Sequence, residues 1–243
     1  MQPTPLHNAR AQQGFGLIEI LVALVIGLFV LLGLASVFLS VKQTFNTQEQ
    51  LSQLQDQERL ALTILTTTLQ SAGYFPDPVT QTSVTALQAK GNFVDGQSTY
   101  GESGDKDKGT SDSISVRYLR RANDGIMDCL GATLTSGADT VVTNSFSISA
   151  NHELVCSLDD GTTNTVLVNG VQSMSILYGT DSSNGGMVDR YLTATELTTG
   201  TLWPNVQTAR ITLTLINPFA ADAGQPATVQ WVHTINLMNR KSA

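Results

Sequence analysis

An apolar run near the N-terminus, interrupted by one carboxylate, constrains this chain more than any other feature. Residues 15–39 form a stretch of about 25 residues, enough for a helix to cross a hydrocarbon core roughly 30 Å thick, and Glu19 is the only charged residue in it. A single carboxylate inside such a helix costs roughly 2.5 kcal/mol or more. A residue with that cost is expected to have a function, so Glu19 is a candidate site residue.

The order of the segments around this run differs from that of a secretory signal peptide. A signal peptide carries an apolar region of about 7–15 residues followed by a cleavage site of small residues. Here a polar leader, residues 1–14, comes first, and its last residue, Gly14, lies directly before Phe15. A cut between these two residues would remove the leader and keep the helix. Arg10 in the leader favours a cytoplasmic leader and an exported C-terminal part.

The segment Gly14-Phe15-Gly16-Leu17-Ile18-Glu19 resembles the N-terminus of type IV prepilins and of the related pseudopilins of type II secretion. The resemblance implies cleavage after Gly14 by prepilin peptidase, N-methylation of Phe15, and pairing of Glu19 with the terminal amine of a neighbouring subunit. The pairing is physically reasonable, because a charge in apolar surroundings persists only when it is paired or neutralised. Gly16 departs from the pattern, which more often has Thr or Ser there. The alternative is an ordinary membrane anchor that tolerates Glu19 near the interface.

The helix is expected to continue beyond the apolar run. No proline occurs from residue 6 to residue 75, and Gly73 followed by Pro76 supplies a stop signal, which predicts a helix of about 58 residues. Its second half, residues 40–73, carries an amphipathic stripe and is expected to pack one face on a globular head. The stripe consists of Leu51, Leu54, Glu58, Ala61, Leu65 and Ala72. A free-standing coiled coil is the alternative, although three clean heptads are missing.

Residues 74–243 change to short β patterns and predict a β-rich head. Strands are expected at residues 114–119, 153–158, 163–169, 174–178, 210–216 and 229–237, with a hairpin turn at Asp159-Asp160-Gly161. The fold class is therefore α+β, a long N-terminal helix packed on an antiparallel sheet. The loops at residues 95–113 and 179–187 are expected to be exposed and to carry partner contacts.

The chain contains two cysteines, Cys129 and Cys156. In an oxidising compartment such a pair predicts one disulfide, which would contribute about 3–4 kcal/mol through loop closure. Two unpaired buried thiols are the alternative. We expect no metal site, because neither a CxxC spacing nor a pair of histidines accompanies the cysteines.

Other functions have weaker support in the sequence. The net charge is −7, and Arg117, Arg120 and Arg121 are the only candidates for a basic patch, so we interpret them as a solvated strand end and expect no direct nucleic-acid binding. His152 and His233 are isolated, so no catalytic triad can be assembled and we expect no enzyme and no cofactor.

Two further motifs, a calcium loop and a phosphate-binding loop, have no good match in the chain. Asp105, Asp107 and Asp112 only faintly match a calcium loop, since Lys106 and Lys108 would repel the ion, and we favour a solvated loop. No phosphate-binding glycine loop is present, so assembly would require an external ATPase.

The whole chain also resembles the minor pilin group typified by PilW. The likeness rests on the cysteine pair, the strand at residues 171–178 and the terminal segment 234–240. It implies a leader at residues 1–14, a membrane and filament helix at 15–39, an amphipathic helix at 40–73 and a periplasmic head at 74–243. The protein would wait in the bacterial inner membrane and then reach the pilus at the cell surface.

The implied partners are prepilin peptidase, other minor pilins, the major pilin and the inner-membrane assembly machinery with its ATPase. Together with them the chain would form a priming or tip complex for adhesion, twitching motility or DNA uptake. A J-type minor pseudopilin of type II secretion is the nearest alternative. A membrane-anchored periplasmic binding module that never enters a filament is another.

Overall fold

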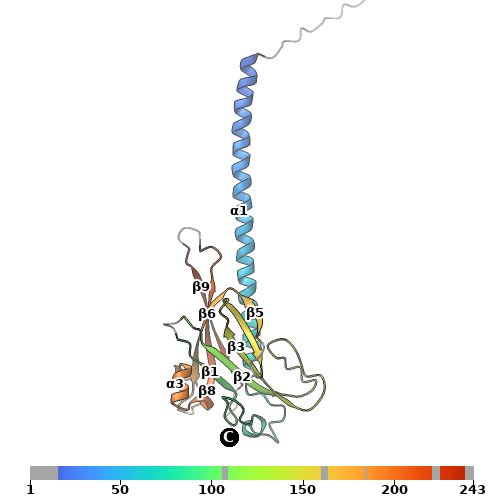
Figure 1. Ribbon diagram of the computed structural model, residues 1–243, viewed down its shortest axis with the longest axis vertical. Coiled ribbons are helices and arrows are strands. Elements are labelled where there is room, and N and C mark those ends of the chain that lie inside the picture. The colour runs from blue at the N-terminus through green and yellow to red at the C-terminus, as the bar shows by residue number, and fades with distance from the viewer. Residues whose placement is uncertain (1–15, 106–108, 160–163, 184, 221–224, 239–243) are drawn as a thin grey trace, which may run out of the picture. The chain divides into compact units, whose positions relative to one another are not determined.

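The computed structural model describes residues 16–105, 109–159, 164–183, 185–220 and 225–238. The chain forms two compact units, Met1–Gln50 and Leu51–Ala243. The helix α1 (Leu17–Gln70) begins in the first unit and ends in the second (Figure 1). The long N-terminal helix and the β-rich head that follows it confirm the predicted α+β class.

The described part of the first unit is the apolar half of α1. The helix begins after Gly16, whose carbonyl accepts hydrogen bonds from the N–H of Glu19 at 3.0 Å and of Ile20 at 3.3 Å. Every residue from 17 to 50 is exposed except the half-buried Gly27. Among the described residues, α1 is the one helix long and apolar enough to cross a membrane, judged by length and composition.

In the second unit the end of α1 packs into the head. The buried residues of this part of the chain are Leu54, Ala61, Leu65, Thr68, Leu69 and Ala72. Four members of the predicted stripe are therefore confirmed as core residues, whereas Leu51 is exposed and Glu58 is half-buried. Beyond the helix, Gly73 adopts a φ of 80° and donates its N–H to the carbonyl of Arg117 at 3.0 Å. The predicted stop signal thus also ties the end of the helix to a strand.

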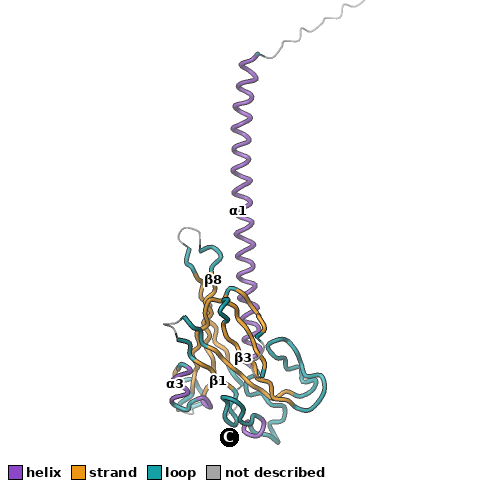
Figure 2. Tube along the Cα trace, viewed as in Figure 1, coloured by secondary structure: helices purple, strands orange, loops and turns teal. Residues whose placement is uncertain are grey.

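The strands of the head form two antiparallel sheets (Figure 2). The five-stranded sheet has the order β1-β2-β3-β4-β5 and contains β1 (Thr99–Glu102), β2 (Ser113–Arg120), β3 (Thr140–Ile148), β4 (Glu153–Leu158) and β5 (Thr165–Asn169). The four-stranded sheet has the order β7-β6-β8-β9 and contains β6 (Val171–Thr180), β7 (Arg190–Leu192), β8 (Val206–Ile216) and β9 (Thr228–Asn236). Two short helices and a 3₁₀ turn complete the described elements: α2 (Ser83–Ala86) before β1, and α3 (Ala194–Thr199) and η2 (Trp203–Asn205) between β7 and β8.

One core joins the two sheets and the end of α1. Strand β6 lies against β2, β3 and β4 of the other sheet. Alternate residues of β8 are buried, which follows from the period of two along a strand. Tyr178 stacks edge-on against Trp203 with ring centroids 5.0 Å apart.

Two sequence predictions about the head were wrong. The strands do not form one sheet, because β2–β5 pair among themselves while β6 pairs with β8 from far along the chain. Residues 95–113 are not simply an exposed loop: they contain β1, and Gln97 and Ser98 are buried. In the second expected loop, Gly179, Thr180 and Asp181 are buried, whereas the described residues 185–187 are exposed.

Candidate functional site

The first candidate site is the start of α1. Gly14 and Phe15, the predicted cleavage and methylation residues, lie outside the described residues. Glu19 lies in the first turn of α1 and is exposed. A carboxylate at this position is stabilised by the positive end of the helix dipole and by N–H groups without helical partners.

The surroundings of Glu19 are otherwise apolar. Leu17, Ile18, Ile20 and Leu21 are all more than half exposed, at 79%, 72%, 58% and 52%. An apolar surface of this kind is suited to lipid or to the helices of other subunits. Within either environment the charge of Glu19 needs a cationic partner or a proton.

The second candidate site is the cystine. Cys129 and Cys156 form the predicted disulfide, with their Cα atoms 6.5 Å apart and a sequence separation of 27. Cys156 lies in β4, and Cys129 lies in the loop between β2 and β3. Both are buried in the main core of the head. The disulfide therefore fastens a long connection to the sheet.

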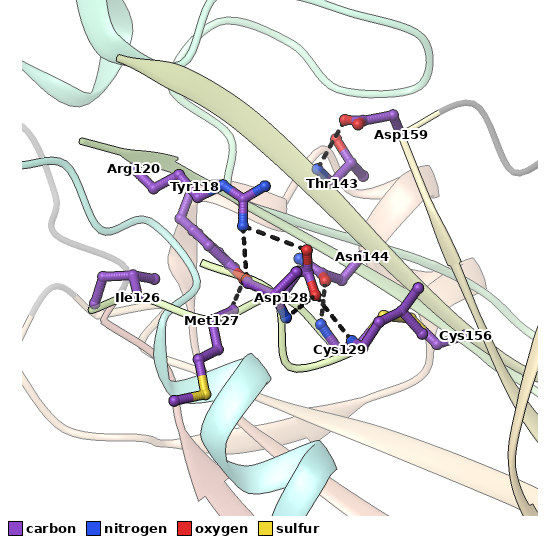
Figure 3. Close-up of polar contacts among 12 residues, drawn as sticks. Tyr118, Arg120, Ile126, Met127, Asp128, Cys129, Thr143, Asn144, Cys156 and Asp159 are labelled. Carbon is purple, nitrogen blue, oxygen red and sulfur yellow. Dashed lines mark hydrogen bonds and ion pairs between the residues drawn. A yellow bond between two sulfur atoms is a disulfide. The ribbon is translucent and has the colours of Figure 1, made fainter. Parts of the chain in front are cut away.

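Asp128, next to the cystine, organises the loop (Figure 3). One carboxylate oxygen, Oδ1, accepts the N–H groups of Leu130 and Ala132, each at 3.0 Å. The other, Oδ2, is 3.3 Å from Nη1 of Arg120. Because Asp128 is almost fully buried, these contacts supply the partners that a buried carboxylate requires.

Polar groups from the sheet complete the arrangement in Figure 3. The buried Asn144 of β3 accepts the N–H of Cys129 at 2.8 Å, and the hydroxyl of Tyr118 donates to the carbonyl of Met127 at 2.6 Å. Burial raises the pKa of Tyr118 to about 12. The loop is thus held by a disulfide, a carboxylate and two side chains of the sheet. The cysteines were predicted from the sequence, but Asp128 and Asn144 were not.

Arg117 was interpreted from the sequence as a solvated strand residue, and that interpretation was wrong. The side chain is buried in the fold, and its guanidinium is 4.7 Å from the ring centroid of Phe93. It donates at 2.6 Å from Nε to the carbonyl of Gln97, at 2.5 Å from Nη1 to Gln88, and at 3.0 and 2.8 Å from Nη2 to Leu87 and Val94. Burial lowers the pKa of Arg117 to about 10, with Asp95 acting in the opposite direction, so the group stays charged at neutral pH.

The other two arginines are paired with acids. Arg120 contacts Asp128 as described above, and Arg121 contacts Asp139 at 3.0 Å. The three arginines do not form a free cationic patch, because Arg117 donates its hydrogen bonds to backbone carbonyls and the other two each contact a carboxylate.

The remaining candidates from the sequence have structural contacts or lie apart. Asp112 accepts the N–H of Gly104 at 2.7 Å and of Ile176 at 2.7 Å, so it fastens β6 to the segment before β2. Asp107 lies outside the described residues. Within the described ranges, no group of three or more His, Cys, Asp or Glu residues is placed to hold a metal ion. His233 is half-buried on the inner face of β9.

Comparison with known proteins gives two matches, which cover separate parts of the chain. Residues 9–35 match the prokaryotic N-terminal methylation motif, which spans Gly14, Phe15 and Glu19. Residues 135–235 match the type IV pilus-assembly protein W family, from just before β3 almost to the end of β9. No curated protein and no solved structure matches the chain.

The two matches support a type IV pilin-like protein, and the apolar helix with a carboxylate in its first turn, followed by a head of antiparallel sheets, is consistent with that class. Within this class the chain resembles the pilus-assembly protein W, and the two matches together support a minor pilin of type IV pili. They imply processing by prepilin peptidase and association with other pilins, and the apolar helix fits an inner-membrane anchor.

Proposed function

We propose that the protein is a minor pilin that joins a priming or tip complex at the start of type IV pilus assembly. The precursor is cut after Gly14, methylated at Phe15, and held in the inner membrane by residues 17–39 of α1 with its head in the periplasm. The helix then leaves the bilayer and packs with the helices of other minor pilins and the major pilin. Adhesion, twitching motility or DNA uptake would follow from the filament that this complex begins.

The observation that carries the proposal is the position of Glu19. It lies in the first turn of an exposed apolar helix, where the carboxylate has apolar neighbours on its own chain. The methylated amine of Phe15 on a neighbouring subunit is a cation of suitable size and position to pair with it. In a packed apolar filament core this pair would be strong, because the local dielectric constant is low.

The orientation of the head has independent support. The cystine between Cys129 and Cys156 forms in the described head, and disulfides persist outside the reducing cytoplasm. The match to pilus-assembly protein W over residues 135–235 favours a pilus over a type II secretion pseudopilin.

The first experiment is mass spectrometry of the N-terminus in protein from sheared surface filaments and from the cell envelope. We expect a peptide that begins at methylated Phe15 in the filament fraction. If that peptide occurs only in the envelope, the protein is a pseudopilin or stays at the assembly base. An intact Met1 start would contradict the prepilin interpretation altogether.

A second experiment isolates the charge of Glu19. The variant Glu19→Gln keeps the shape of the side chain and removes its charge, so we expect normal cleavage and at least a tenfold loss of the protein from filaments. The matched control is Glu49→Gln, which removes an exposed carboxylate from the same helix outside the apolar run. Equal incorporation of both variants would exclude the pairing role of Glu19.

A further inference from the structure

A pocket of about 400 Å³ lies on the outer face of the five-stranded sheet, away from the cystine and the apolar helix. Its volume falls within the range of about 300–1,000 Å³ that is typical of small-molecule sites. Five of the ten residues that line it carry a hydroxyl group, and the ring of Phe93 adds apolar surface. The pocket therefore suits a ligand that has both hydroxyl groups and an apolar face.

The floor of the pocket is a row of side chains across four strands. Tyr100 of β1 pairs with Ser115 of β2, Ser115 pairs with Ser145 of β3, and Ser145 pairs with Ser157 of β4. Residues paired in this way project from the same face of a sheet. The hydroxyls of Ser115 and Ser145 are 2.7 Å apart. Short side chains make the floor low, and each hydroxyl can both donate and accept hydrogen bonds.

One wall of the pocket is the tip of a small hairpin. Lys90 and Phe93 exchange two backbone hydrogen bonds of 3.1 Å, with Gly91 and Asn92 between them. Gly91 has a φ of 59°, as the first central residue of a type II′ turn requires. The ring of Phe93 lies 6.0 Å from that of Tyr100, so two aromatic rings border the hydroxyl floor.

The wall is fixed from below by Arg117. Its guanidinium binds the backbone carbonyls on both sides of the hairpin and stacks under Phe93. The buried charge and its four acceptors hold the hairpin in one position over the sheet. The pocket is therefore preformed, which lowers the entropy cost of binding.

The described residues that line the pocket carry one charge of each sign. Among them, Lys90 is the one basic residue and Asp159 the one acidic residue, and Asp159 accepts the N–H of Thr143 at 3.2 Å (Figure 3). A nucleotide or another polyanion would need several cationic groups, whereas this described lining offers one, and Arg117 below the wall is already bound to four carbonyls. The balance favours an uncharged ligand.

An extended peptide does not fit this floor. Peptides that bind sheets do so by adding a strand to a free edge. Strands β2, β3 and β4, which carry the serines, are each hydrogen-bonded to neighbours on both sides. Recognition here must therefore go through side chains.

We propose that this pocket binds a neutral carbohydrate, a mono- or disaccharide unit. The sugar hydroxyls would exchange hydrogen bonds with Ser115, Ser145 and Ser157 on the floor and with Asn92 at the rim. The apolar C–H face of the sugar ring would lie toward Phe93 and Tyr100, whose rings supply apolar area. The site does not depend on the proposed assembly function, because none of its residues belongs to the helix or the cystine.

The test is saturation-transfer difference NMR on the full-length protein in a detergent without a sugar headgroup. The probes are glucose, galactose, mannose, N-acetylglucosamine, lactose and diacetylchitobiose. We expect saturation transfer to at least one of them. Absence of transfer to all six would overturn the proposal.

Two pairs of variants locate the binding. Ser145→Leu fills the floor and should weaken binding at least tenfold, whereas Ser147→Leu, on the same strand face but outside the pocket, should change it less than twofold. Asn92→Ala at the exposed tip should weaken binding at least threefold without affecting folding, and Gln88→Ala on the same segment is its control. Unchanged binding in Ser145→Leu and Asn92→Ala, or equal losses in the controls, would overturn the assignment.

Discussion

At the scale of single residues, Arg117 shows how a charge can serve structure instead of recognition. Its hydrogen bonds go to four backbone carbonyls rather than to a carboxylate, and the guanidinium also lies over the ring of Phe93. A lysine has three donors on one nitrogen and cannot reproduce the planar fork. The segment between residues 87 and 97 therefore depends on this one side chain.

We predict that Arg117→Lys lowers the free energy of unfolding of the head by roughly 2–4 kcal/mol, because buried carbonyls lose their donors. Unfolding can be followed by the fluorescence of Trp203 and Trp231, which both lie in the head. Arg121→Lys is the control: its pair with Asp139 is exposed, and such pairs are worth about 0–1 kcal/mol. Similar losses in the two variants would show that the carbonyl contacts contribute little.

The sequence could not reveal this role of Arg117. An arginine in the segment Ser-Val-Arg-Tyr-Leu-Arg alternates with apolar residues, and the pattern places it correctly on the face opposite Val116 and Tyr118. What covers that face is the segment at residues 87–97, which has no regular periodicity. The exposure of a strand residue depends on such distant segments, so the prediction of a solvated side chain failed.

At the scale of elements, local signals were enough for the helix and the β4–β5 hairpin. Gly73 and Pro76 mark the end of the helix. Asp159, directly after β4, has a φ of 53°, while Asp160 and Gly161 of the predicted turn lie outside the described residues. The pairing of β6 with β8 and the short β1 have no such signal. Strand β1 has four residues and includes Gly101, and glycine is disfavoured in strands. Its place in the sheet is decided by tertiary packing.

Gly101 is required in β1 because of its close contact with the other sheet. A Cβ at this position would collide with the phenol of Tyr178 and would lie 2.7 Å from the carbonyl oxygen of Ser113. Burial raises the pKa of Tyr178 well above its ordinary value, and Asp112 adds to this effect. The ring is also held against Trp203, so it has little freedom to move away.

We predict that Gly101→Ala destabilises the head by about 1–3 kcal/mol, the usual cost of overpacking. Chemical denaturation of the full-length protein in detergent would measure it. Gly185→Ala is the matched control, since the nearest atom to its added Cβ, Oγ of Ser183, is 3.4 Å away and its φ is not positive. A neutral Gly101→Ala variant would mean that β1 can shift away from Tyr178.

At the same scale, the sequence predicted the disulfide between Cys129 and Cys156. It did not predict the side chains that hold the loop around this disulfide. Two cysteines in an exported segment can pair in one way only, so the disulfide needed no structural knowledge. Asp128 directly before Cys129 is typical of a turn residue, and that signal could have identified it. Asn144 carries no such signal, because a buried amide within a strand is recognised only through the N–H of Cys129 that it binds.

At the scale of the whole molecule, the apolar helix and the disulfide together bear on which side of the membrane the head lies. The helix fits an inner-membrane anchor. Arg10 before the apolar run favours a cytoplasmic leader. The proposed assembly function places the second unit on the oxidising side of the membrane, where the disulfide of the head would persist.

This topology predicts that neither cysteine of the wild-type protein reacts with a maleimide-polyethylene-glycol reagent in unreduced, denatured cell extracts. After reduction, both thiols should react and the band should shift by two additions. The variant Cys129→Ser is the control, because its single remaining thiol at Cys156 should react without reduction. Two reactive thiols in the unreduced wild type would place the head in the reducing cytoplasm and would contradict the assembly proposal, since a pilin head must cross the membrane before its helix can enter a filament.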